Sequence, residues 1–197
     1  MKAGAIILAG GKSSRMGTNK ALLPIDGVTN IERIKNILAE VFEEIIIVAN
    51  DEAAYRFLNL PIIKDKVLDK GPLAGIQAGL LAAKYETNLI IACDMPFISP
   101  LVAIKLVKES NDYDAVVPVI SGKQHPLFAV YKKAILPTLD DCLQTDQLRI
   151  KNLLDRVHVK YNTEDDLLDK EIDKLDQVFY NMNQPWEYEK VVNLTKK

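Results

Sequence analysis

Cysteine, net charge and long apolar runs are all scarce in this chain, and each scarcity excludes a class of protein. Cys93 and Cys142 are the only cysteines and form no C-x-x-C pair. We therefore expect neither a disulfide framework nor a zinc cluster, and a reducing compartment is the simplest setting. The 25 Lys and Arg against 27 Asp and Glu give a net charge of −2, which disfavours nucleic acid as a partner.

No stretch approaches the roughly 20 apolar residues of a membrane span. The short apolar run after Met1 lacks the length and cleavage site of a signal peptide. We therefore expect a cytoplasmic protein without a membrane partner. A chain of 197 residues with 48% hydrophobic content can bury roughly 70% of its unfolded surface as one domain.

Short apolar runs alternate with helical periods along the chain, which predicts parallel βαβ units. The expected fold is a single α/β domain over residues 1–197, with three layers (α/β/α) and a mostly parallel, Rossmann-like sheet. Residues 162–173 are weakly patterned and are predicted as a surface loop. Strands are predicted over residues 5–9, 44–49, 60–63, 89–92, 115–119, 127–131, 157–160 and 178–180, and helices over 30–41, 51–58, 72–83, 99–108, 132–143, 148–154 and 185–192.

The turn after the first predicted strand is the first place to look for a ligand, because ligands in such sheets sit beyond the carboxyl ends of strands. Residues 8–17 read LAGGKSSRMG. The glycines allow a close backbone approach, and Lys12, Arg15 and Lys20 add charge that suits a triphosphate. A P-loop would need glycine where Ile6 stands, and the glycine spacing does not fit G-x-G-x-x-G. From the glycines alone, a turn with solvated charges remains an alternative.

Five motifs in order resemble a known family. The first, LAGGKSSRMGTNK at residues 8–20, is similar to the signature of nucleotidyltransferases with a glycosyltransferase-A-like fold. The chain resembles the molybdenum cofactor guanylyltransferases from residue 5 to about 190. It departs from them at Asn19, where the family more often has Asp, and at His125, where it often has Gln or another polar residue. The other four motifs are GPLAGI at 71–76, CDMPF at 93–97, PLFAVY at 126–131 and NMNQP at 181–185.

The resemblance implies transfer of GMP from GTP to the terminal phosphate of molybdopterin or Mo-molybdopterin, with Mg²⁺ as cofactor and release of pyrophosphate. It implies catalytic roles for Arg15, Lys20 and Asp94, with Asp94 as the metal ligand. It also leaves room for transient contact with other cofactor-biosynthesis proteins. Contacts to the nucleotide, the second substrate or the metal are implied for Leu8, Ala9, Gly10, Gly11, Lys20, Asn50, Asp65, Gly71, Asp94, Asn181 and Asn183.

The chemistry of the residues agrees with such a transfer. One anion must attack another, so a divalent cation and fixed positive groups are the remedy. One aspartate is adequate for Mg²⁺, which takes further oxygens from phosphate and water. The attacking phosphate is already ionised near pH 7, so the protein needs no nucleophile of its own. Two other functions stay open: a cytidylyltransferase acting on the same pterin, and a non-catalytic adaptor that binds nucleotide and delivers cofactor.

Structural alternatives stay open for single residues. Asp94 could be a helix cap or a solvated turn residue, and Asn50 could cap the helix that follows it. Asp65 could form a surface ion pair with Lys64 or Lys66. Gly71 and Gly75 could serve helix packing, and Asn181 and Asn183 could serve turn formation.

Overall fold

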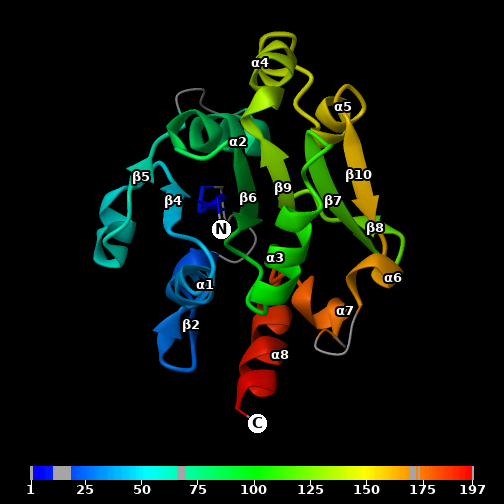
Figure 1. The fold of residues 1–197 in the computed structure, drawn as a ribbon. Coiled ribbons are helices and arrows are strands. Elements are labelled where there is room, and N and C mark those ends of the chain that lie inside the picture. Colours follow the sequence, from blue (N-terminus) through cyan, green and yellow to red (C-terminus); the bar gives the residue numbers. More distant parts are fainter. Residues whose placement is uncertain (1, 11–18, 66–69, 169–171, 173, 197) are drawn as a thin grey trace.

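The computed structural model describes residues 2–10, 19–65, 70–168, 172 and 174–196. Its main feature is a sheet of eight strands that lies between helices (Figure 1). The strands are β1 (Gly4–Leu8), β4 (Glu44–Val48), β5 (Ile62–Ile63), β6 (Thr87–Ala92), β7 (Ala115–Ile120), β8 (Lys123–Gln124), β9 (Phe128–Lys132) and β10 (Val159–Asn162). Their order is β10-β7-β9-β6-β1-β4-β5, with β8 paired to β7.

The central strands run parallel, and both of their faces are covered. All five residues of β1 are buried, as in strands of parallel sheets that carry helices on each side. β1 pairs in parallel with β4 and β6, and β10 pairs in parallel with β7. Only β9 runs antiparallel among the seven strands of the ordered path, between β6 and β7. The prediction of a mostly parallel sheet is confirmed.

Helices cover both faces of the sheet. Ile34 of α1 and Leu106 of α3 belong to the core on one face, whereas Leu73 of α2, Leu139 of α4 and Leu153 of α5 belong to the core on the other. The predicted three-layer arrangement is therefore confirmed. The helices are α1 (Asn30–Ala39), α2 (Gly71–Ala82), α3 (Pro100–Lys108), α4 (Leu136–Gln144), α5 (Ile150–Leu154), α6 (Glu164–Leu167), α7 (Leu175–Val178) and α8 (Pro185–Thr195), with 3₁₀ turns η1 (Lys20–Leu22), η2 (Ala53–Leu58) and η3 (Lys133–Ile135).

Two glycines of α2 face side chains of β1 at short range. A Cβ on Gly79 would lie 2.5 Å from Ile6 Cγ2, and one on Gly75 would lie 3.3 Å from Leu8 Cδ2. Real side chains do not tolerate the first distance, so Gly79 is required by the packing. Gly75 thus serves the helix packing that was its structural alternative.

Two predicted elements are wrong. Residues 178–180 do not form a strand, because α7 ends at Val178 and Phe179 packs its ring against Phe128, 5.0 Å away between centroids. The apolar residues there serve a helix end rather than a sheet. The predicted loop over 162–173 contains the last residue of β10 and the short helix α6, which begins with a capping box between Thr163 and Asp166.

A small hairpin escaped the sequence analysis. β2 (Pro24–Ile25) and β3 (Val28–Thr29) pair antiparallel around Asp26 and Gly27, which both have positive φ, 51° and 83°. An Asp-Gly pair between apolar residues is a strong signal for this two-residue turn. Within the described ranges, no helix has the length and apolarity needed to cross a bilayer.

Candidate functional site

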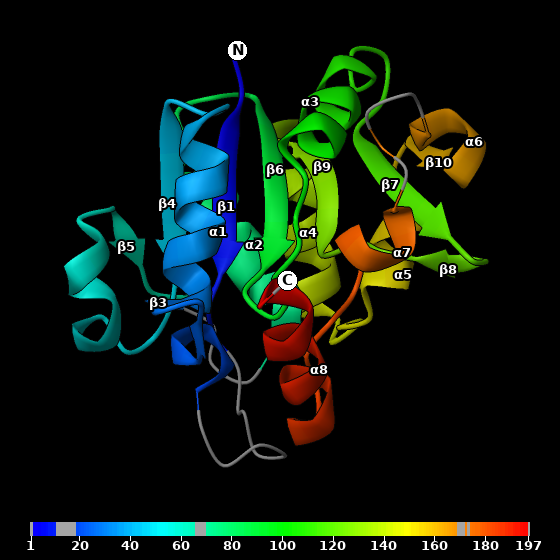
Figure 2. The ribbon, with the colours of Figure 1, turned by 90° about the horizontal axis from the view of Figure 1, so that it is seen from below.

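The carboxyl ends of three parallel strands form the edge on which the site is built. Leu8 of β1 is in register with Val48 of β4 and Ala92 of β6. The backbone continues this pairing past the strands, since Ala9 N donates to Val48 O (2.9 Å) and Cys93 N donates to Leu8 O (3.1 Å). The residues that follow β1, β4 and β6 are thereby held at one edge, and Figure 2 shows α8 beside the end of β6.

Lys20, Asp94 and Asn183 come together at this edge from three distant parts of the chain. Lys20 Nζ donates to Asn183 Oδ1 at 2.8 Å, although 163 positions separate the two residues. Met182 N donates to Asp94 O at 2.8 Å, which fixes the segment before α8 against the turn after β6. The structure thus assembles three of the predicted site residues into one cluster.

Glu187 holds that segment from the other side. Its Oε2 accepts from the backbone N–H groups of Asn183 (2.5 Å) and Gln184 (2.8 Å). Glu187 stands at the third position of α8 and forms a capping box with Gln184. The sequence analysis missed Glu187, although the Q-x-x-E spacing before a helix is a recognisable signal.

Burial dominates the electrostatics of Asp94. It raises the pKa of the Asp94 carboxyl above its usual value, and Glu187 raises it further, while Lys20 and Lys123 pull it down. Burial also raises the pKa of the Cys93 thiol to about 12. Cys93 therefore remains a thiol near neutral pH and is not a nucleophile, in agreement with a packing role.

The donor set at this edge fits a single Mg²⁺ held jointly with substrate oxygens. Asp94 offers one carboxylate, and no group of three His, Cys, Asp or Glu side chains gathers anywhere in the described part of the chain. Mg²⁺ commonly takes one or two carboxylates and completes its shell with water and phosphate. A carboxylate that burial disfavours in its ionised form also gains from a nearby cation.

The backbone of the first motif is already partly engaged. Ala9 uses its N–H on Val48, and its carbonyl accepts from the Tyr55 hydroxyl at 3.0 Å. Leu8 O is taken by Cys93 N, as above, and Gly10 follows as an exposed residue. The predicted residues Gly11 and Arg15 lie outside the described residues, as does Lys12.

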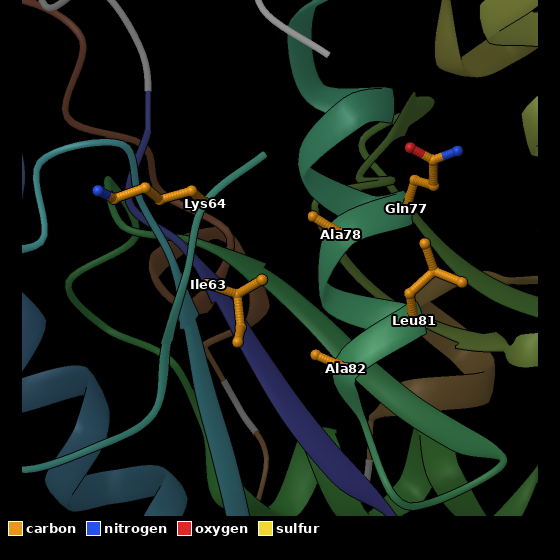
Figure 3. Close-up of a pocket in the computed structure, with 6 residues that line it drawn as sticks. All are labelled: Ile63, Lys64, Gln77, Ala78, Leu81 and Ala82. Atoms are coloured by element: carbon orange, nitrogen blue, oxygen red, sulfur yellow. The ribbon is translucent and has the colours of Figure 1, made fainter. Parts of the chain in front are cut away.

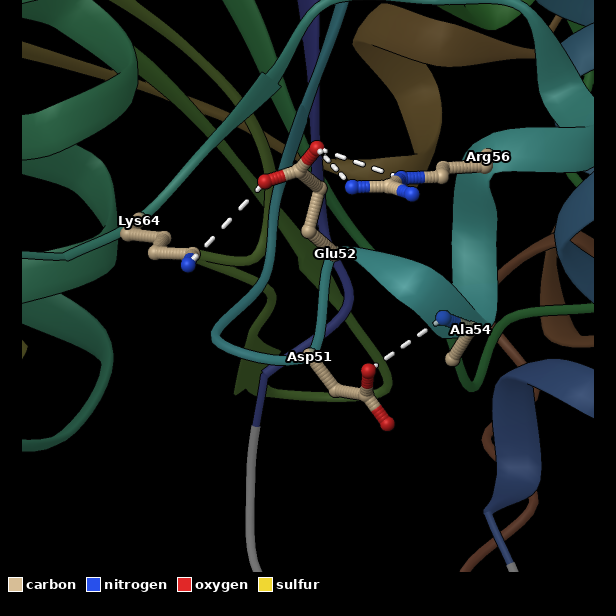
Figure 4. A network of polar contacts seen from close by, with 5 residues as sticks. All are labelled: Asp51, Glu52, Ala54, Arg56 and Lys64. Carbon is tan, nitrogen blue, oxygen red and sulfur yellow. Dashed lines mark hydrogen bonds and ion pairs between the residues drawn. The ribbon is translucent and has the colours of Figure 1, made fainter.

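Asn50 and Asp51 have different roles at the end of β4. Asp51 Oδ1 accepts from Ala54 N at 3.3 Å, so Asp51 rather than Asn50 supplies the side-chain acceptor near the start of η2 (Figure 4). Asn50 itself is exposed at the sheet edge. Its alternative role as a helix cap is therefore wrong.

Asp65 has an orphaned oxygen. Its Oδ1 is buried and makes no hydrogen bond to any residue that the structure describes. Lys64 lies 4.0 Å from Glu52 instead (Figure 4), and Lys66 lies outside the described residues. Buried polar oxygens are nearly always paired, so Asp65 has unused capacity to accept a hydrogen bond.

Gly71 and Asn181 make no hydrogen bond to the cluster of Lys20, Asp94 and Asn183 among the described residues. Gly71 starts α2 with a φ of +65°, a conformation that favours glycine. Asn181 is half-buried, two residues before Asn183. Among the described residues no hydrogen bond or ion pair joins Asn50, Asp65 or Asn181 to Lys20, Asp94 or Asn183.

Asn30, the first residue of α1, supports the turn after β6 with its side chain. It is fully buried, and its Nδ2 donates to Cys93 O at 2.6 Å. Thr29 is the residue that caps α1, accepting from Glu32 N at 3.3 Å. Asn30 therefore pins the turn that presents Asp94.

A hollow of about 260 Å³ lies away from this cluster, between β5 and α2. Figure 3 shows Ala78 and Ala82 of α2 pointing towards Ile63 of β5. The hollow includes neither Lys20 nor Asp94. It is smaller than most small-molecule sites, which measure roughly 300–1,000 Å³.

Comparison with known proteins shows which family the chain resembles. A family model described as "MobA-like NTP transferase domain" matches residues 5–160. The chain is 36% identical over 185 residues to a probable molybdenum cofactor guanylyltransferase of Pelotomaculum thermopropionicum, covering 94% of this chain and 89% of that protein. It is 38% identical over 188 residues to the protein of the same description in Carboxydothermus hydrogenoformans, covering 95% of this chain and 94% of that protein.

Solved structures show the same architecture. Molybdopterin-guanine dinucleotide biosynthesis protein A from Archaeoglobus fulgidus superposes with a TM-score of 0.84 at 26% identity, over 98% of each chain. A CMP:2-keto-3-deoxy-manno-octonic acid synthetase superposes with a TM-score of 0.79 at 14% identity, over 100% of this chain and 99% of the other. The second likeness concerns the fold alone, that of the nucleotidyltransferases with a glycosyltransferase-A-like fold, as the first motif implied.

Proposed function

The chain belongs to the MobA-like NTP transferase family and is a nucleotidyltransferase, and from this premise we propose that it transfers GMP from GTP to the terminal phosphate of molybdopterin. The product is molybdopterin guanine dinucleotide, and pyrophosphate leaves. Molybdopterin with or without bound molybdenum has the same acceptor phosphate.

The observation that carries the proposal is the meeting of Lys20, Asp94 and Asn183 at the carboxyl edge of the sheet. The 2.8 Å contact between Lys20 Nζ and Asn183 Oδ1 joins a cation to an amide, and the charge of Lys20 acts on the Asp94 carboxyl, whose pKa it lowers. A triphosphate needs the cation, a divalent metal needs the carboxylate, and a second substrate can use the amide. Because residue 20 and residue 183 serve one cluster, we take residues 1–197 as one catalytic unit.

The reaction exchanges one phosphoanhydride bond for another. An oxygen of the molybdopterin phosphate forms a bond to the α-phosphorus of GTP, and the bond to the β-phosphate oxygen breaks with its electron pair leaving on pyrophosphate. Mg²⁺ held by Asp94 would supply positive charge against the crowded phosphate oxygens. Lys20 donates to the triphosphate and gives up Asn183 to do so.

The other residues bind and orient in this proposal. Gly10 and the start of α2 at Gly71 offer backbone N–H groups, and a helix N-terminus favours an anion. The orphaned oxygen of Asp65 accepts from a hydroxyl or amine of the nucleoside. Asn50, exposed beyond β4, is placed for the base or ribose, and Asn181 for the second substrate.

The proposal is tested by turnover with purified protein, molybdopterin and Mg²⁺, following pyrophosphate with GTP and with CTP in parallel. We expect release with GTP and little with CTP. Preference for CTP would make the chain a cytidylyltransferase and overturn the guanylyl assignment. Binding of nucleotide without any pyrophosphate release would favour an adaptor that delivers cofactor.

A further inference from the structure

Tyr55 of η2 links two parts of the site without being one of the predicted residues. Its side chain is 2% exposed. The hydroxyl donates to Ala9 O at 3.0 Å and accepts from Asn19 Nδ2 at 2.9 Å. Asn19 Oδ1 in turn accepts from Ala21 N at 3.1 Å. Three consecutive hydrogen bonds therefore join the end of β1 to η1, the turn that carries Lys20.

The backbone groups at the two ends of this series of hydrogen bonds set the direction of each bond. The Ala9 carbonyl can only accept, so the Tyr55 proton must point to it. The Ala21 N–H can only donate, so Asn19 must turn its oxygen to Ala21 and its NH₂ to Tyr55. Burial raises the pKa of the Tyr55 hydroxyl, which keeps this proton in place at neutral pH.

The arrangement needs an amide at position 19. An ionised aspartate has no proton to donate, so it would compete with the Ala9 carbonyl for the single proton of Tyr55. Asn19 is thus the residue type that lets one hydroxyl serve both ends. The departure from the family's more frequent Asp has a structural use in this chain.

We propose that Tyr55 is a positioning residue for nucleotide binding, which through Asn19 sets where Lys20 stands relative to the end of β1. The inference rests on the proposed function for the identity of the nucleotide. Tyr55 is buried behind the site, and its hydroxyl is bonded to Ala9 O and Asn19 Nδ2, so its effect reaches the substrate through the residues that it holds and not by direct contact. Removing the hydroxyl leaves the ring in place but cuts the connection.

The first test compares steady-state kinetics of the wild type, Tyr55→Phe and Asn19→Asp. One net hydrogen bond corresponds to about a fivefold change in affinity, so we expect the KM for GTP to rise about fivefold in Tyr55→Phe with kcat nearly unchanged. Asn19→Asp should raise KM similarly, and the double variant should fall short of the product of the two effects, because both break the same chain of bonds.

Ser110→Ala is the matched control. Ser110 is also a buried hydroxyl that donates to one backbone carbonyl, Val107 O at 2.8 Å, but it lies after α3, before the amino end of β7. We expect Ser110→Ala to lower the melting temperature without moving KM. An equal rise of KM in Ser110→Ala and Tyr55→Phe would show general destabilisation and overturn the proposal.

A second readout does not depend on the substrate. In the ligand-free protein, amide hydrogen exchange of Ala21 followed by NMR should be faster in Tyr55→Phe than in wild type, and unchanged in Ser110→Ala. Unchanged exchange at Ala21 in Tyr55→Phe would overturn the positioning role. If the wild type fails to use GTP, the proposed function falls, and this exchange result alone decides whether Tyr55 positions Lys20.

Discussion

Replacing Asp94 by asparagine should lower activity while raising stability, because the two depend on the charge in opposite ways. The amide keeps the size of the side chain and removes the negative charge. Loss of one preorganised electrostatic group costs about 10²–10³ in turnover, or about 2.7–4 kcal/mol of transition-state stabilisation. We expect a loss in that range for Asp94→Asn, measured as pyrophosphate release at saturating GTP and Mg²⁺.

The stability effect has a sign that follows from the pKa. Burial raises the pKa of Asp94 in the folded state, so the ionised carboxylate opposes folding at pH 7. This penalty is present at neutral pH and disappears as pH falls below the pKa of the unfolded chain. Asp94→Asn should therefore melt at a higher temperature than wild type at pH 7, and the two curves should converge in acid.

Asp114 offers a control for this pair of measurements. It precedes β7 at the opposite edge of the sheet, where Asp114 Oδ2 accepts from His158 N at 2.9 Å. An asparagine oxygen can still accept this bond, so Asp114→Asn should retain near wild-type turnover. Wild-type turnover in Asp94→Asn, together with a lower melting temperature, would refute the reasoning and make Asp94 a structural residue.

Three further predictions concern Lys20, Gly79 and His125. Lys20→Ala should raise the KM for nucleotide about 10- to 100-fold, as expected for loss of a charged hydrogen bond. A large fall in melting temperature with unchanged KM would instead show that Lys20 serves to hold Asn183. Gly79→Ala should lose about 1–3 kcal/mol in denaturant unfolding because its Cβ would meet Ile6, whereas a gain would show that helix propensity outweighs the clash. Burial lowers the pKa of His125 to about 4 from 6.5, so the protein should lose about 1–2 kcal/mol of stability as pH falls from 6.5 to 4. Urea unfolding of His125→Gln should show a flatter pH profile over that range.

The sequence predicts which strand ends form the site edge of the sheet better than it predicts which distant segments pack against that edge. β-branched apolar runs such as residues 44–49 mark buried parallel strands, and parallel strands end at one edge. Leu8, Ala9, Gly10 and Asp94 could therefore be placed from local pattern alone. The antiparallel insertion of β9 could not, because its apolar run reads the same in either direction.

The contacts that complete the site depend on the path of the chain near its end. Val178, Phe179 and Tyr180 look like a strand by residue type, yet Phe179 packs on the rings of Phe128 and His125 at the end of a helix. Local propensity cannot reveal that packing, which leads the chain to Met182 and Asn183. The resemblance to a family supplied Asn183 as a site residue, whereas its bond to Lys20 required the structure.

Buried hydroxyl and amide groups are the least predictable part. Tyr55 and Asn30 stand in helical patterns where a tyrosine is usually core and an asparagine usually a cap. Their partners, the carbonyls of Ala9 and Cys93, are backbone atoms that carry no signal in the sequence. Side-chain bonds to backbone carbonyls of this kind can be identified only from the three-dimensional arrangement of strands and turns.

The most direct test is a crystal structure of the protein with a non-hydrolysable GTP analogue and Mg²⁺. We expect the triphosphate within hydrogen-bond distance of Lys20 Nζ, with the metal ion bound to the Asp94 carboxylate. A nucleotide seated in the hollow between β5 and α2, or phosphates that contact neither Lys20 nor Asp94, would contradict the assignment of the active site.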